Sequence, residues 1–343
     1  MKIEKEQWIK IIFWILIIIG IIIRVINYPT ALAEMNSDEI MTALNAKSIV
    51  ETGKETNGIS YPVYLQAWGG QSVMLLYLSV ILMKIFGTTL LAVRLPMLVI
   101  SLIGMFVVYD LTKKLTNNKN IALIALGLTA ISPWHMLQSI WSLDCNMFPH
   151  FLIIALDIFY TGIIKNKKGI IYVSMVFFAV TLYCYGIAVY FVPLFLLITS
   201  IYLFKIKKIT IKDILISICI FLLFSLPILT MFAINVLGIK NNINIGPITI
   251  PYYEHLSRTN DMIFFAPNKL AQIGKNILAT LQVIFIQYDG LEWNASLIFG
   301  TIYPITLIFL IVGIIKLIKE KKNSDNNIAK FILLLWLSIT IIV

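Results

Sequence analysis

Asp38 and Glu39 are two adjacent carboxylates in the first polar stretch of the chain that is longer than a turn, residues 28–70. A long apolar run precedes this stretch, so the pair follows closely on the point at which a membrane helix would reach the surface. A carboxylate in that position can accept a proton from a hydroxyl group or help to hold a hard divalent cation. Asp38 and Glu39 are therefore the first candidates for catalysis.

The same residues also suit the start of a helix. Asn36 or Ser37 is a favourable N-cap, and Asn36 and Glu39 have the spacing of a capping box. Negative charge is favourable in a first helical turn, and the amphipathic pattern up to Gly53 predicts a helix on the membrane surface. The sequence leaves the structural and the catalytic interpretation open.

Three further residues are candidates to coordinate an acceptor or a metal. Asp144 and Asn146 lie in a second short polar passage, and Tyr61 lies in the first one. Asp38 and Asp144 together could hold a divalent cation, which is the cofactor that this set predicts. The alternative for Asp144 is that it only begins the following helix.

Arg94 and Arg258 are the candidates for binding a phosphate group. Arg94 lies three residues inside an apolar run, where an arginine is costly unless it snorkels to the interface or finds a partner. It is either an interface anchor or a ligand of a phosphate or carboxylate group, and we favour a phosphate ligand, since a planar guanidinium fits phosphate oxygens. Arg258 could act in the same way or belong to an ordinary solvated loop, and His135 is interpreted as a helix-end histidine with satisfied partners.

The composition indicates a membrane protein that crosses the bilayer several times. Of the 343 residues 59% are hydrophobic and 13% are charged, and the mean hydropathy is +0.91, values that exclude a soluble globular domain. The net charge of +10 does not predict nucleic-acid binding, because the lysines form short clusters between apolar runs. The runs long enough to span, at least roughly, are 8–26, 91–111, 121–137, 148–164, 170–186, 187–204, 214–237, 297–317 and the incomplete 328–343.

The apolar run 73–86 is short, and it decides the topology. If it does not cross, every lysine cluster falls on the side of the basic N-terminus, as the positive-inside rule requires. We therefore predict an interfacial or re-entrant helix there, and a cytoplasmic N-terminus. The clusters are Lys113, Lys114 and Lys119; Lys165, Lys167 and Lys168; Lys205, Lys207, Lys208 and Lys212; and Lys316, Lys319, Lys321 and Lys322.

The predicted architecture is an all-α membrane protein with one transmembrane domain over residues 1–343. Its outer loops are 27–90, 138–147 and 238–296, and they collect the carboxylates on the face opposite the lysines. The last apolar run has no closing polar residues, which suggests a chain truncated at its C-terminus.

The order of the motifs resembles that of a known family. The motifs are Asp38-Glu39, Thr52-Gly53, Tyr61-Pro62, Phe86-Gly87, Leu91-Ala92-Val93-Arg94-Leu95-Pro96, Ser132-Pro133-Trp134-His135 and Ser142-Leu143-Asp144. This series resembles the membrane glycosyltransferases of the C-type fold, and among them family 39, the dolichyl-phosphate-mannose protein mannosyltransferases and the bacterial aminoarabinose transferases. The resemblance covers nearly all of residues 8–160 and continues more weakly through 289–304.

The resemblance implies a polyprenyl-phosphate-dependent glycosyltransferase of the EC 2.4 class in a bacterial plasma membrane. It implies inverting transfer from a polyprenyl-phosphate sugar to a hydroxyl group of a protein, lipid or wall glycan on the extracytoplasmic face. Asp38 then matches the base and Glu39 its acidic neighbour, while Arg94 and Asp144 match an arginine and an acidic residue of the family. Residues 68–72 depart from the family pattern of a basic residue or histidine with a Pro-Pro pair, which leaves Arg94, Arg258 or a metal to meet the donor phosphate.

Two other functions remain open from the sequence. A secondary transporter or lipid flippase would carry ionisable residues near the bilayer midplane, often in paired repeats. Here the spans hold little charge apart from Arg94 and Asp157, and the carboxylates lie in the outer passages. A non-catalytic scaffold for assembly would leave Asp38 and Asp144 replaceable.

Overall fold

The computed structural model describes residues 2–31, 34–254, 266, 268–291, 298–319 and 327–342. Within these ranges five helices are long and apolar enough to cross a membrane. They are α1 (Lys2–Val25), α4 (Leu90–Thr116), α7 (Asp144–Ile164), α9 (Ala188–Lys205) and α10 (Ile211–Val236). Their outward faces are apolar, with Trp8 62% and Leu223 70% exposed. The protein is therefore a multi-pass membrane protein, as predicted.

The predicted span 121–137 is a bent pair of helices. α5 (Lys119–Ile131) and α6 (Pro133–Ile140) meet at 56° and would make a sixth span if counted together. Ser132 forms the break: its hydroxyl accepts a hydrogen bond from the backbone N–H of His135, and Pro133 takes the first helical position, where no N–H is needed.

The predicted span 170–186 is shorter than expected. α8 (Lys168–Thr181) has 14 residues, and the chain turns at residues 182–187 before α9 begins. The apolar run 170–186 thus continues past Thr181, where α8 ends. The buried cluster that α8 forms with its neighbours includes Phe178 and Phe195, whose rings lie 6.1 Å apart. Because lipid tails are as apolar as these side chains, close packing rather than hydrophobic burial favours such contacts between membrane helices.

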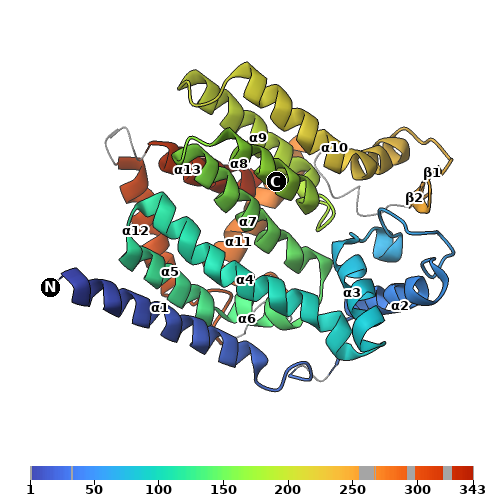
Figure 1. Cartoon of the computed structure of the whole chain (residues 1–343), viewed down its shortest axis with the longest axis horizontal. Coiled ribbons are helices and arrows are strands. Elements are labelled where there is room, and N and C mark those ends of the chain that lie inside the picture. Colours follow the sequence, from blue (N-terminus) through green and yellow to red (C-terminus); the bar gives the residue numbers. More distant parts are fainter. Residues whose placement is uncertain are drawn as a thin grey trace.

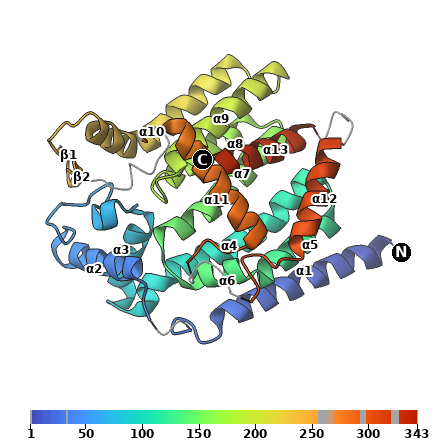
Figure 2. The same ribbon diagram turned by 180° about the vertical axis from the view of Figure 1, so that it is seen from behind.

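One end of the bundle carries the short elements, as Figures 1 and 2 show. These are α2 (Ser37–Thr52), the 3₁₀ turn η1 (Ala67–Gly69), α3 (Met74–Phe86) and the antiparallel strands β1 (Ile243–Ile245) and β2 (Ile248–Ile250). α3 is 13 residues long, roughly 20 Å, which is too short to cross a hydrocarbon core of about 30 Å. It packs against α2, so the run 73–86 is interfacial as predicted.

The opposite end carries the lysine clusters. Lys119 lies 2.5 Å from Glu6 of α1, and Lys168 lies 3.9 Å from Asp213 at the start of α10. The turns after α4, α7 and α9 are therefore on the side of the described N-terminal residues (Figure 1). Lys321 and Lys322 lie outside the described residues.

The predicted outer passage 238–296 contains an unexpected helix. α11 (Lys269–Ile286) has 18 residues and lies beside α12 (Thr306–Lys319) and α13 (Asn327–Ile342) in Figure 2. Asn276 donates to the carbonyl of Ile342 at 3.5 Å, and Gln287 donates to the carbonyl of Tyr303 at 3.3 Å. These contacts lie at the end of α13 and just before the start of α12. The middle and the C-terminal end of α11 therefore lie at the loop end of the bundle, which fits an interfacial helix.

The two ends can be distinguished by cysteine labelling. In a background without Cys145, Cys184 and Cys219, a cysteine at Asn118 should be shielded in whole cells from a membrane-impermeant thiol reagent, and Asn241→Cys, in the segment before β1, should be labelled. Both positions are exposed. Ready labelling at Asn118 with protection at Asn241 would contradict the orientation.

Candidate active site

The first turn of α2 forms the capping box that its sequence predicts. The Asn36 side chain accepts a hydrogen bond from the Asp38 N–H at 3.0 Å, and the Glu39 carboxylate accepts one from the Asn36 N–H at 3.2 Å. The box fixes the backbone at Asp38 and Glu39. It places the two side chains about 100° apart around the helix, so they face different surroundings.

Glu39 faces inward and pairs with Arg94. Both side chains are fully buried, and the guanidinium donates to both carboxylate oxygens, from Nε at 3.0 Å and from Nη2 at 2.9 Å. Arg94 also donates to the carbonyls of Pro29 at 2.6 Å and Glu34 at 3.0 Å. Such a bidentate pair is strong and fixes geometry, because both charges are removed from solvent and hydrogen-bonded.

This arrangement does not fit the prediction that Arg94 binds the donor phosphate. A phosphate would have to displace Glu39 or a loop carbonyl from a buried guanidinium. The same arrangement makes Glu39 unsuited to proton transfer, because Glu39 Oε1 accepts a further hydrogen bond from the Ser142 N–H at 2.9 Å. Ser142 in turn donates its hydroxyl to the Val93 carbonyl at 2.8 Å. Glu39 thus joins the starts of α2 and α4 to the turn before α7.

Asp144 belongs to the same cluster. Its side chain is 3% exposed, and its two oxygens accept from the backbone N–H groups of Ser72 and Cys145, each at 2.9 Å. The neighbouring Gln71 donates from Nε2 to the Thr42 hydroxyl at 3.1 Å and to the Asp38 carbonyl at 3.4 Å. Asp38 and Asp144 therefore lie at the same end of the bundle, linked through two consecutive residues.

Gly70 sets the conformation that brings Gln71 and Ser72 to these partners. Its φ is +138°, and a Cβ there would lie 2.9 Å from the Tyr64 hydroxyl oxygen. A side chain at this position would therefore be strained and would collide with Tyr64. The segment 68–72, which departs from the family pattern, is built into the cluster.

Asp38 differs from its two acidic neighbours. Its side chain is half-buried, and within the described part of the chain its carboxylate has no hydrogen-bond or ion-pair partner. Nearby, four buried polar atoms likewise lack partners among the described residues: the hydroxyls of Tyr28 and Ser72, Gln71 Oε1 and Trp141 Nε1. Buried polar groups are normally hydrogen-bonded. Their concentration here indicates a place for a polar ligand or ordered water.

Two predicted residues, Tyr61 and Asn146, are not brought into this cluster. Tyr61 lies against Gly53, which is at the other end of α2 and roughly 22 Å from Asp38 along the helix axis. Asn146 bonds locally, from Nδ2 to the Trp141 carbonyl at 3.0 Å. The predicted Arg258 lies outside the described residues.

For the predicted metal site, the described residues provide two carboxylates rather than a complete set of ligands. No group of three or more His, Cys, Asp or Glu side chains that could hold a metal occurs in the ranges that the structure describes. Asp38 and Asp144 would supply two carboxylates, a number that suits Mg²⁺ when substrate phosphate and water complete its shell.

Sequence reasoning missed several buried polar residues. Gln71 and Ser72 follow Gly69-Gly70, a glycine pair that signals an irregular backbone. Arg24 and His150 lie inside predicted spans, where an ionisable residue is itself a signal of function. His135 was interpreted as satisfied, but its Nε2 has no partner among the described residues.

Comparison with known proteins agrees with this architecture. Residues 70–231 match the model of the dolichyl-phosphate-mannose-protein mannosyltransferase family. Crystal structures of ArnT from Cupriavidus metallidurans, in the apo state and bound to undecaprenyl phosphate, match 98% of the chain with TM-scores of 0.51 and 0.52 at 12% identity. The chain spans 59% of the length of that ArnT chain. No curated protein sequence matches.

The chain therefore has the fold of the C-type membrane glycosyltransferases. Within that class, the match over residues 70–231 confirms the resemblance to the protein mannosyltransferase family seen in the motif order.

Breaking the Glu39–Arg94 pair should strongly destabilise the protein. Arg94→Met leaves a buried carboxylate without its cation, so we expect the free energy of unfolding to fall by about 3–5 kcal/mol. Denaturant titration of the purified protein in detergent measures the loss.

Lys47→Met is the matched control, because Lys47 lies 3.9 Å from Glu51 in an exposed pair on α2. Its loss should cost less than about 1 kcal/mol. Equal midpoints for Arg94→Met and the wild type would show that the buried pair contributes nothing.

Proposed function

We propose that this protein is an inverting glycosyltransferase of the extracytoplasmic face. It would move a sugar from a polyprenyl-phosphate donor to a hydroxyl acceptor of a protein, lipid or wall glycan. The observation that carries the proposal is the carboxylate of Asp38, which has no partner among the described residues and lies at the same end of the fold as the hydrogen-bonded carboxylates of Glu39 and Asp144. The ArnT structure with undecaprenyl phosphate supports a lipid-borne donor.

Asp38 is the group suited to accept a proton. In the proposed reaction the acceptor oxygen attacks the anomeric carbon of the sugar, and its proton passes to the Asp38 carboxylate. The bond from that carbon to the phosphate oxygen breaks, and the electron pair leaves with the polyprenyl phosphate. Attack opposite the leaving group inverts the configuration.

Glu39, Arg94 and Asp144 position Asp38 in this mechanism. Glu39 and Arg94 hold the first turn of α2 against α4, and Asp144 holds Ser72 and hence Gln71 beneath the Asp38 backbone. Fixed placement matters because a misplacement of about 1 Å can cost on the order of 10²-fold in rate.

The placement of the protein follows from the same proposal. A polyprenyl-linked donor is embedded in the bilayer, so the site must lie at the membrane surface, as the interfacial helices α2 and α3 do. With the lysine clusters on the cytoplasmic side, the site faces away from the cytoplasm, in the plasma membrane of a bacterium.

Asp38→Asn should abolish transfer while leaving the protein folded. General-base catalysis contributes on the order of 10²–10⁴ in rate, so turnover should fall at least about 10²-fold. Release of radiolabelled sugar from a polyprenyl-phosphate donor measures it, alongside donor binding, which should be nearly unchanged.

Glu51→Gln is the control on the same helix, since Glu51 is exposed and far from Asp38. It should retain wild-type turnover. Normal turnover by Asp38→Asn would remove the base from the proposal.

A divalent cation is a separate part of the proposal. If Asp38 and Asp144 hold it together with the donor phosphate, a chelator should lower turnover and added Mg²⁺ should restore it. Asp144→Asn should then raise the Mg²⁺ concentration needed for half-maximal rate. Turnover that is unaffected by chelator would exclude the cation and leave the role of Asp38 intact.

A further inference from the structure

A second polar cluster lies within the helix bundle, away from Asp38. Arg24 of α1 is fully buried and donates to the carbonyls of Gly20 at 2.8 Å, Ala130 at 2.9 Å and Thr129 at 3.1 Å. Its Nη2 also lies 2.7 Å from His135 Nδ1. Among the described residues, no carboxylate lies within ion-pair distance of Arg24. The carbonyls at the end of α5 offset only part of its positive charge.

The contact with Arg24 fixes the state of His135. A guanidinium can only donate hydrogen bonds, so Nδ1 of His135 must accept, and in the neutral ring the proton lies on Nε2. This Nε2–H has no partner among the described residues. It is a buried hydrogen-bond donor without an acceptor among those residues.

His150 of α7 adds two more unpaired atoms. Its ring is 2% exposed and lies 5.1 Å from the ring of His135, yet neither of its nitrogens has a described partner. Gly104 of α4 allows the close approach, because a Cβ there would lie 2.5 Å from His150 Nδ1. A neutral histidine has one N–H donor and one acceptor nitrogen, so the pair offers two donors and one acceptor.

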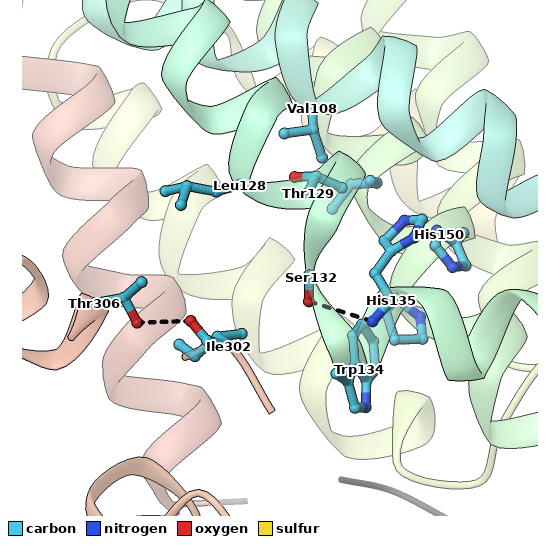
Figure 3. A pocket seen from close by; sticks show the side chains of 11 residues that line it. Val108, Leu128, Thr129, Ser132, Trp134, His135, His150, Ile302 and Thr306 are labelled. Atoms are coloured by element: carbon cyan, nitrogen blue, oxygen red, sulfur yellow. Dashed lines mark hydrogen bonds between the residues drawn. The ribbon is translucent and has the colours of Figure 1, made fainter. Parts of the chain in front are cut away.

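Both histidines line a cavity of about 340 Å³ (Figure 3). Its volume is within the range of small-molecule sites, about 300–1,000 Å³. Most of the remaining wall is aliphatic or aromatic, including Leu128, Ile153 and Ile302. Figure 3 shows Ile302 and Thr306 of the C-terminal part facing the histidines from the opposite side. The cavity therefore combines a polar wall that carries the two histidines with apolar walls, and Arg24 lies behind His135, outside the lining.

A monoanionic phosphomonoester satisfies the three unpaired histidine nitrogens; Arg24 Nε, which also lacks a partner among the described residues, does not line the cavity. Two of its oxygens accept from His135 and His150, and its P–OH donates to the remaining nitrogen of His150. A phosphodiester has no P–OH, and a neutral alcohol has no charge to offset Arg24. The apolar walls suit an attached hydrocarbon chain better than free phosphate.

We propose that this cavity binds the phosphate of a phosphomonoester lipid, at a site separate from the Asp38–Asp144 cluster. The inference rests on the proposed function for the identity of the lipid. Transfer converts a sugar-bearing diester into polyprenyl phosphate, which is a monoester. His150 lies six residues after Asp144 on α7, or roughly 9 Å along the helix, so the released carrier would have a short distance to travel.

Equilibrium binding to the full chain tests the inference without any transfer reaction. The probe is radiolabelled polyprenyl phosphate in detergent micelles, with polyprenol, a polyprenyl phosphodiester and inorganic phosphate as competitors. Wild-type protein should bind the probe saturably, and unlabelled polyprenyl phosphate should compete better than the alcohol, the diester or inorganic phosphate. His150→Phe keeps the ring and removes both nitrogens, so affinity should fall at least about tenfold, the effect of one lost hydrogen bond to a charged group.

Two further variants control for folding and for charge. His150→Gln retains a donor and an acceptor and should recover part of the affinity, a result that a purely structural role would not give. Lys84→Gln removes an exposed cation from α3 and should bind as the wild type does. Thermal unfolding without lipid confirms that each variant is folded.

Four results would overturn the inference: no saturable binding, unchanged affinity in His150→Phe, equal competition by the alcohol or diester, or equal competition by inorganic phosphate. The last would assign the site to free phosphate. Binding without any transfer activity would contradict the proposed function and would still support this binding site. Transfer activity together with unchanged binding in His150→Phe would contradict this binding site and leave the proposed function intact.

Discussion

The buried pair of Glu39 and Arg94 is the interaction on which the rest of the site depends. Removing two charges from water is costly, and the cost is offset only where the remaining donors and acceptors are also satisfied. Here the Pro29 and Glu34 carbonyls and the Ser142 N–H satisfy them. The pair therefore fixes the first outer loop, the start of α4 and the turn before α7 in one arrangement. Asp38, one residue before Glu39, inherits a fixed position.

Local sequence patterns were sufficient for most of the fold. The capping box at Asn36 and Glu39 depends only on residues three apart, and the interfacial assignment of 73–86 depends on length and on lysine placement. The limits appear where an apolar run continues through a turn, as after Thr181, or where a segment of mixed polarity forms a helix, as in α11. Hydropathy reports the surroundings of a residue, whereas helix ends depend on backbone hydrogen bonds.

The roles of the site residues were less predictable, because they depend on partners distant in the sequence. Arg94 was recognisable as a buried arginine needing an anion, but the sequence did not show whether Glu39 or a substrate would supply it. Likewise the sequence has Arg24 as a single charge within an apolar stretch, but it could not show that Arg24 contacts His135, which is 111 residues away. A residue type limits the chemistry of its partner, and only the fold selects which one.

The distribution of buried charge also separates an enzyme from a transporter. A transporter carries ionisable groups along its pathway near the bilayer midplane. Here Asp157 pairs with Lys114 at 2.7 Å near the lysine-rich end, where it has a cationic partner and needs no substrate. Asp38, which has no partner among the described residues, lies at the loop end, whereas His150 lies within the bundle, roughly 9 Å along α7 from Asp144. The proposed base at one polar end and the proposed phosphate site in the bundle suit transfer from a lipid phosphate better than passage across the membrane.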